Sequence, residues 1–175
     1  MAFIILIFVT VGCTTSLPTL PTFGLGEKEF SLTSIDEQLQ GQLPRSKKTS
    51  FGTLKLLGVA LQPGAEDKDL EVLAKFVLVS YEIPEGIEGV VGYKAALRYN
   101  PKTRALQLGD LQATKLNFGN PSLEEYVSSA ARRGIPREVA ALLREMTLQR
   151  MPEGFRANRV GAFRVRNDKL FVDFD

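Results

Sequence analysis

The longest stretch with helical periodicity covers residues 122–150, SLEEYVSSAARRGIPREVAALLREMTLQR. Its apolar residues recur every three or four positions, which places one apolar stripe along a helix. Asn120 and Ser122 are candidate N-caps, and two Glu residues follow in the first turn, where the helix dipole favours negative charge. Pro136 has no N–H to donate, so the pattern predicts a helix that kinks or restarts there.

Period-two patterns precede this helix. They predict four strands, at about residues 53–61, 70–83, 89–100 and 105–118. The second of these strands is apolar on both faces, so we expect it to be covered on both sides or to line an apolar cavity. The period of the fourth slips near Gly109 and Asp110, which predicts a β-bulge and a bend.

The two ends of the domain carry shorter patterns. Residues 30–32 alternate, and Thr33 is a candidate N-cap for a short helix, TSIDEQLQGQL, with Asp36 three residues on. Residues 45–50 are basic and polar and predict a loop. Two short strands near the C-terminus, at residues 160–165 and 170–174, are joined by a candidate two-residue turn at Asn167 and Asp168.

These patterns predict an α+β domain. Its strongly curved antiparallel β-sheet wraps around a long kinked C-terminal helix, and a short N-terminal helix completes it. The apolar stripe of the helix needs an apolar partner, which the preceding strands supply.

The composition limits the chemistry. The chain has 175 residues with 44% hydrophobic residues, enough for one ordinary domain. The net charge of +2 does not indicate nucleic-acid binding. With no His and a single Cys, the usual base of a nucleophilic triad, an intramolecular disulfide and a Cys-based metal cluster are all excluded. A hydrolase built on a carboxylate pair remains an alternative, but no motif favours it. We expect no enzymatic activity, no cofactor and no metal.

The start of the chain is apolar. Residues 2–11, AFIILIFVTV, are too few to span a bilayer and have the length of the apolar region of a secretory signal. The segment TTSLPTLPTFGLG that follows is rich in Thr, Pro and Gly and predicts a flexible tether.

The apolar run that ends in Val11-Gly12-Cys13 resembles a bacterial lipoprotein signal. This resemblance implies cleavage before Cys13, a diacylglycerol on its thiol and an acylated amino group. Residues 1–12 are then the signal peptide, residues 13–28 the lipidated Cys and tether, and residues 29–175 a single domain. Thr14, rather than Asp, after the Cys implies the outer membrane, with the domain facing the periplasm from the inner leaflet. The alternative is a plain secretory signal or a buried apolar segment, with an incidental Cys.

Three segments, FSLTSIDEQL, NPKTRALQLGDLQATKL and GAFRVRNDKLFVDF, together with the order of elements, resemble the YceB-like bacterial lipoproteins, a family of largely undefined function. The resemblance covers about residues 30–175. That family is similar in turn to one half of the tubular lipid-binding (TULIP) proteins, which hold acyl chains between a curved sheet and a helix. The resemblance therefore implies a groove for an apolar ligand.

We therefore predict a membrane-anchored lipoprotein that binds a lipid or another apolar molecule. The candidate groove residues are Leu57, Phe76, Leu78, Tyr93, Leu97, Tyr99, Leu142 and Met146. The alternative for each residue is an ordinary place in the core. The arginines after residue 131 either face anionic head groups or form a solvated, paired surface. The alternative function is an interaction or structural lipoprotein that docks on an envelope complex, with a partner that the sequence does not identify.

Overall fold

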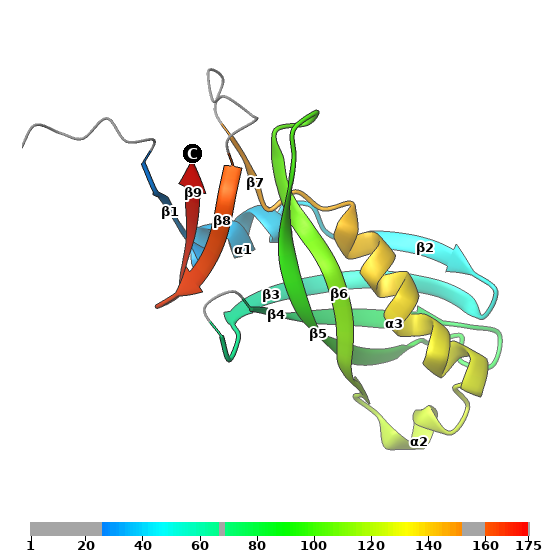
Figure 1. Cartoon of the computed structure of the whole chain (residues 1–175). Helices are drawn as coiled ribbons and strands as arrows, with labels where there is room; N and C mark the ends of the chain where they lie inside the picture. Colours follow the sequence, from blue (N-terminus) through cyan, green and yellow to red (C-terminus); the bar gives the residue numbers. More distant parts are fainter. Residues whose placement is uncertain (1–25, 67–68, 152–159, 175) are drawn as a thin grey trace, which may run out of the picture.

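The structure is a computed structural model that describes residues 26–66, 69–151 and 160–174. Of these residues, 53% are in strands and 21% in helices. The strands form a six-stranded antiparallel sheet, in the order β2-β3-β4-β5-β6-β7, and a three-stranded sheet, β1-β9-β8 (Figure 1). The larger sheet consists of β2 (Arg45–Thr49), β3 (Gly52–Pro63), β4 (Leu70–Val79), β5 (Ile87–Asn100), β6 (Ala105–Phe118) and β7 (Gln149–Arg150).

Helix α3 (Ser129–Arg144) lies along the larger sheet and contacts β2, β3 and β6 (Figure 1). Its apolar stripe is buried there, as the helical periodicity predicts. Ile135, Val139 and Leu143 have no exposed surface, and they join the core with the inward residues of β4.

The smaller sheet joins the two ends of the domain. Strand β1 (Lys28–Ser31) pairs with β9 (Lys169–Phe174), which forms a hairpin with β8 (Val160–Arg166). Asn167 and Asp168 both have positive φ, so the predicted two-residue turn is confirmed. Helix α1 (Leu32–Gln40) contacts β1 and β3, and Ile35 and Leu39 are fully buried.

The fold-class prediction is wrong. The described residues are mostly β and form two sheets, and no long kinked C-terminal helix is present among them. The predicted helix over residues 122–150 is divided into α2 (Pro121–Glu124), α3 and strand β7. The break lies at residues 125–128, and α3 continues through Pro136.

N-capping explains where the helix breaks. The Ser128 hydroxyl accepts a hydrogen bond from the Ala131 N–H at 3.2 Å, while the Asn120 side chain caps α2 through the Ser122 N–H at 3.0 Å. An N-cap residue has non-helical backbone angles, so a helix cannot continue through it. The two N-caps, which lie eight positions apart, therefore start two separate helices. Beyond α3, the Leu148 N–H donates to the Leu106 carbonyl at 2.8 Å, so the chain becomes an edge strand.

Several smaller predictions also need correction. The basic segment predicted as a loop is strand β2, which pairs with β3 along its whole length. Charged residues are typical of an edge strand, because they discourage pairing with another chain. The predicted capping box in α1 is absent: Asp36 accepts the Leu61 N–H at 3.0 Å, and the N-cap is Ser31.

The strands of the larger sheet follow the predicted pattern more closely. The register shift between Ala95 and Leu97 leaves Gly109 and Asp110 unpaired on β6, which confirms the predicted bulge. In β4 the even positions are buried, but Leu73, Val77 and Val79 on the opposite face are only partly buried. The two-sided apolar pattern therefore marks a sheet with one face in the core and one face half-exposed, not a strand covered on both sides.

Within the described residues, no helix has the length and apolar character needed to cross a bilayer.

Candidate functional site

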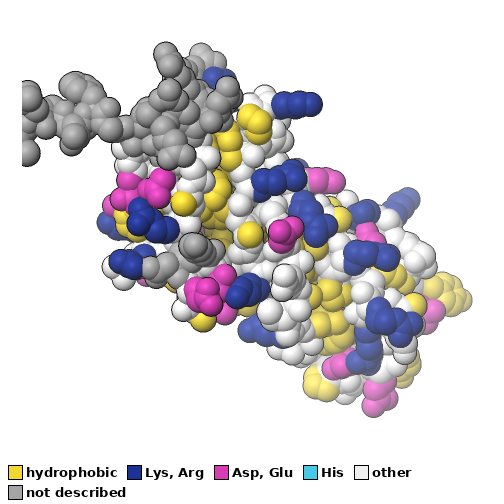
Figure 2. Space-filling model, in the orientation of Figure 1, with side chains coloured by type: hydrophobic (Ala, Val, Ile, Leu, Met, Phe, Trp, Pro, Cys, Tyr) yellow, Lys and Arg dark blue, Asp and Glu magenta, His cyan; other side chains and the backbone are white. Residues whose placement is uncertain are grey.

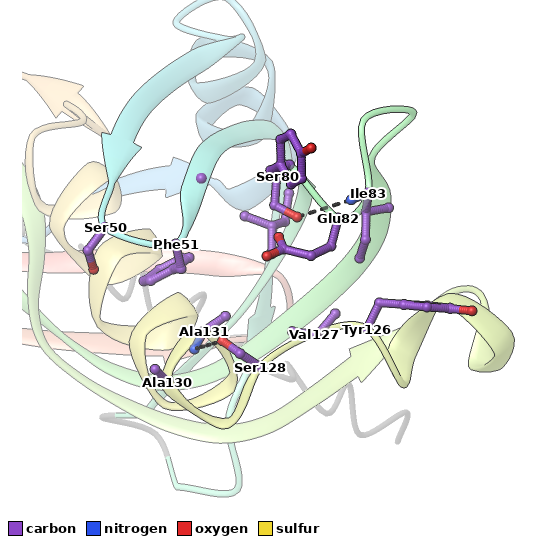
Figure 3. Close-up of a pocket in the computed structure, with 13 residues that line it drawn as sticks. Ser50, Phe51, Ser80, Glu82, Ile83, Tyr126, Val127, Ser128, Ala130 and Ala131 are labelled. Carbon is purple, nitrogen blue, oxygen red and sulfur yellow. Dashed lines mark hydrogen bonds between the residues drawn. The ribbon is translucent and has the colours of Figure 1, made fainter.

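A cleft of about 470 Å³ opens at one end of the layer formed by the larger sheet and α3 (Figure 3). Three connections form it: the β2–β3 turn, the β4–β5 turn and the loop from α2 to α3. Its volume falls in the range typical of small-molecule sites. It is lined by Ser50, Phe51, Gly52, Leu78, Ser80, Tyr81, Glu82, Ile83, Tyr126, Val127, Ser128, Ala130 and Ala131.

The β2–β3 turn places an aromatic ring in the wall of the cleft. The Thr49 hydroxyl donates to the Gly52 carbonyl at 2.8 Å and accepts from the Phe51 N–H at 3.3 Å. Gly52 has a φ of +133°, and a Cβ there would lie 2.4 Å from the Val79 carbonyl oxygen, so only Gly fits this position. The half-buried Phe51 ring packs on Gly134 of α3 and separates the cleft from the core behind it.

The β4–β5 turn supplies the opposite wall. The Ser80 N–H donates to the Ile83 carbonyl at 3.2 Å, and the Ile83 N–H donates to the Ser80 hydroxyl at 3.2 Å. Ile83 is 1% exposed and anchors the turn in the core. Tyr81 and Glu82, the two residues between them, are therefore held at the surface of the cleft.

The α2–α3 loop forms the floor. Val127 and Ala131 are buried, and the Ser128 cap fixes the start of α3 beside them. Arg132 holds the loop in place, because its guanidinium donates to the Glu124 carboxylate and main-chain carbonyl at 2.5 and 2.6 Å and to the Val127 carbonyl at 3.1 Å.

The rim of the cleft is aromatic. Tyr81 is 96% exposed and Tyr126 is 62% exposed, and they are two of the three large apolar side chains that are exposed among the described residues. Figure 3 shows the Tyr126 side chain extending outward from the loop. An apolar floor below exposed aromatic side chains suits a molecule with an apolar part and a polar part.

The structure brings few of the predicted groove residues to this cleft. Leu78 lines it, and Leu97 lines a separate pocket of about 220 Å³ beside Arg144. Leu57 is 37% exposed at the β3 bulge, and Tyr99 is partly buried against the core. The rest of the predicted groove residues are packed in the core: Phe76, Tyr93, Leu142 and Met146.

The space that the sequence predicts as a groove is occupied by these core side chains. The Tyr93 hydroxyl donates to the Pro136 carbonyl at 2.6 Å and joins the sheet to the middle of α3. Burial raises the pKa of the Tyr93 phenol, so the group stays protonated and remains a donor. The cleft beyond Phe51 therefore lies outside this packed space, at the end of the layer.

Several of the arginines are paired. Arg132 binds Glu124, Arg137 contacts Glu138 at 3.1 Å, and Arg164 contacts both Glu27 and Asp173. Lys and Arg side chains are spread over the face shown in Figure 2 and alternate with Asp and Glu. This distribution favours the alternative of a solvated, paired surface over a head-group patch.

Apart from Leu78, the residues that line the cleft were missed because most of them lie in turns and caps. Phe51 follows a segment predicted as a loop, and Tyr81 and Glu82 fall at the end of a strand predicted to reach residue 83. Two signals pointed to them: an aromatic residue next to Gly52, and the sequence Ser80-Tyr81-Glu82 before Pro84. Neither signal shows that the three connections meet in space.

No model of a known protein family matches this sequence, and no curated protein matches it. The resemblance to the YceB-like lipoproteins therefore stays a prediction. Cys13 lies outside the described residues, so its lipidation stays a prediction as well. No group of three or more metal-ligating side chains occurs in the part of the chain that the structure describes.

Proposed function

We propose that this chain is a membrane-tethered binding protein that holds the alkyl part of an amphiphile in the cleft at the end of α3. The observation that carries the proposal is the cleft itself, which has a buried apolar floor of Leu78, Ile83, Val127 and Ala131 under a rim of exposed tyrosines. The binding is passive and is driven by removal of apolar surface from water. The tether is the acylated Cys13, which keeps the domain at the periplasmic face of the outer membrane.

The expected energetics follow from the apolar floor. Each methylene group that the cleft removes from water contributes about 0.8 kcal/mol, or about fourfold in Kd. Affinity is therefore expected to rise with chain length across octyl, decyl and longer maltosides, and to level off once the cleft is full.

Ala130 offers a way to test this site. It is exposed in the first turn of α3 and lines the cleft, whereas its exposed neighbour Ser129 is not among the lining residues. Ala130→Trp places an indole in the cleft, and Ser129→Trp is the matched control that places the same indole outside it. The chain contains no other Trp, so fluorescence reports the surroundings of each indole.

Isothermal titration of the full chain with alkyl maltosides below their critical micelle concentrations measures the outcome. We expect Ala130→Trp to weaken binding at least tenfold and Ser129→Trp to leave it unchanged. Equal effects of the two substitutions, or no rise of affinity with chain length in the wild-type protein, would refute the proposal.

A second candidate function is a docking domain that binds another envelope protein. It is favoured by the packed space between the sheet and α3 and by the exposed Tyr81 and Tyr126, because aromatic residues are enriched in protein interfaces. Under this alternative, Tyr126→Ala abolishes capture of the partner, whereas the alkyl maltosides do not bind.

A further inference from the structure

Glu82 is the one charged residue among the described residues that line the cleft. Other polar groups in the lining include the hydroxyls of Ser50, Ser80 and Ser128. Figure 3 shows the Glu82 side chain directed into the space between the β4–β5 turn and α3. None of the ion pairs among the described residues involves it.

The turn fixes the backbone from which this carboxylate extends. The reciprocal hydrogen bonds between Ser80 and Ile83 hold the residues between them, and the buried Ile83 side chain prevents the turn from swinging away from the cleft. A charge on a constrained turn loses less conformational entropy on binding than one on a flexible loop. The backbone of Glu82 is thus held beside the cleft before a ligand binds.

The start of α3 opposes this charge only in part. Ser128 is the N-cap of α3 and Ala130 lies in its first turn, where the N-terminal end of the helix dipole is equivalent to about half a positive charge. The Ser128 hydroxyl already accepts a hydrogen bond from the Ala131 N–H, one of the N–H groups that have no partner within the helix. The full negative charge of Glu82 is larger than this partial positive charge.

We propose that the cleft selects amphiphiles whose polar end carries an ammonium group, and that the Glu82 carboxylate binds this group. The inference rests on the proposed function, since the alkyl part occupies the cleft as described above. The preference runs against the net charge of +2 of the whole chain, which attracts anions in general. A preference for ammonium therefore requires a local site.

The test compares two ligands that share one alkyl chain: dodecyltrimethylammonium and dodecyl maltoside. Both are titrated into the full chain below their critical micelle concentrations. We expect the ammonium ligand to bind about fivefold more tightly, which corresponds to a partly exposed ion pair. Glu82→Gln should bring the ratio of the two ligands' affinities close to one and leave the affinity for the maltoside unchanged.

Glu85→Gln is the matched control. Glu85 is exposed in the same β4–β5 connection but is not among the residues that line the cleft. This substitution removes the same charge from the protein, so the wild-type ratio should persist.

The outcomes separate the two proposals. If neither ligand binds the wild-type chain, or if Ala130→Trp fails to weaken either ligand, the proposed function falls and the inference falls with it. If both ligands bind in the cleft but the ratio is one, favours the maltoside, or is unchanged by Glu82→Gln, only the ammonium site is refuted.

Discussion

Gly134 lies inside α3 and is buried against Phe51, and this contact makes Gly134→Ala an informative substitution. Gly inside a helix usually costs about 1 kcal/mol relative to Ala, so the substitution should stabilise an ordinary helix by that amount. Here a Cβ would lie 2.4 Å from Phe51 Cε1, 3.1 Å from Cζ and 3.3 Å from Cδ1. Carbon atoms in favourable contact are about 3.5–4.0 Å apart, so the ring has to move by about 1 Å.

Overpacking and helix propensity therefore act in opposite directions, and their balance decides whether Gly134→Ala raises or lowers the free energy of unfolding. Overpacking of this size costs about 1–3 kcal/mol, which exceeds the gain of about 1 kcal/mol in helix propensity. We expect Gly134→Ala to lower the free energy of unfolding by about 1 kcal/mol in the wild-type background. In the Phe51→Ala background the ring that blocks the Cβ is absent, so Gly134→Ala should raise the free energy of unfolding by about 1 kcal/mol. The coupling between the two positions is then about 2 kcal/mol.

Urea unfolding of the four proteins, the wild type, the two single variants and the double variant, measures this coupling. If Gly134→Ala stabilised both backgrounds equally, the Phe51 ring would not rest on the helix at this point. The wall that we place between the cleft and the core would then be absent.

Three further predictions test other parts of the account. Ser128→Ala should lower the free energy of unfolding by about 1 kcal/mol in urea unfolding, because the cap of α3 is lost; an unchanged midpoint would contradict the helix break at this residue. Burial raises the pKa of the Asp36 carboxyl above its ordinary value of 3.8, although the Leu61 N–H partly offsets the effect, so ionised Asp36 destabilises the fold above its raised pKa. Asp36→Asn should therefore raise the thermal midpoint at pH 7, and the difference from the wild type should shrink as pH falls towards 3.8; a difference that is constant with pH would refute this explanation. Cys13→Ala should move the protein from the membrane fraction to the soluble periplasmic fraction, and retention in the membrane pellet would contradict the lipid tether.

Local patterns were enough to predict much of the larger sheet. Strands β3 to β6 begin and end within a few residues of the predicted positions, except where β4 stops at Val79 and the turn begins. These strands alternate clearly, and their turns contain Pro, Gly or Asn, which are local signals. The bulge at Gly109 was predicted for the same reason, because the period changes within the strand itself.

Long-range pairing was not predictable in this way. The pairing of β1 with β9 joins Lys28 to Val172, and no local pattern specifies a partner so far along the chain. β2 has a polar sequence and becomes a strand because β3 is beside it, with Lys47 bonded to Glu138 of α3 at 2.8 Å. The helix was predicted too long because its apolar periodicity continues across Ser128. In the structure Ser128 is an N-cap, and α3 begins after it despite that periodicity.

The candidate site shows the same limit. The predicted groove residues were chosen as apolar residues on strands and on the helix, and such residues mainly fill the core. The residues that line the open cleft come mostly from three connections and the start of α3, together with Gly52 of β3 and Leu78 of β4. Their meeting depends on the curvature of the sheet, which the sequence indicates only through its bulges.

The most direct test of the central claim is to locate a bound alkyl chain on the protein. Paramagnetic broadening by a spin-labelled stearate, with its label midway along the chain, can be measured for the backbone amides of the full chain by NMR. We expect strong broadening at Leu78, Ala130 and Ala131, and little at Leu142 and Met146 near the other end of α3. Strong broadening at Leu142 and Met146, or none at the cleft, would show that the cleft is not where an apolar ligand binds.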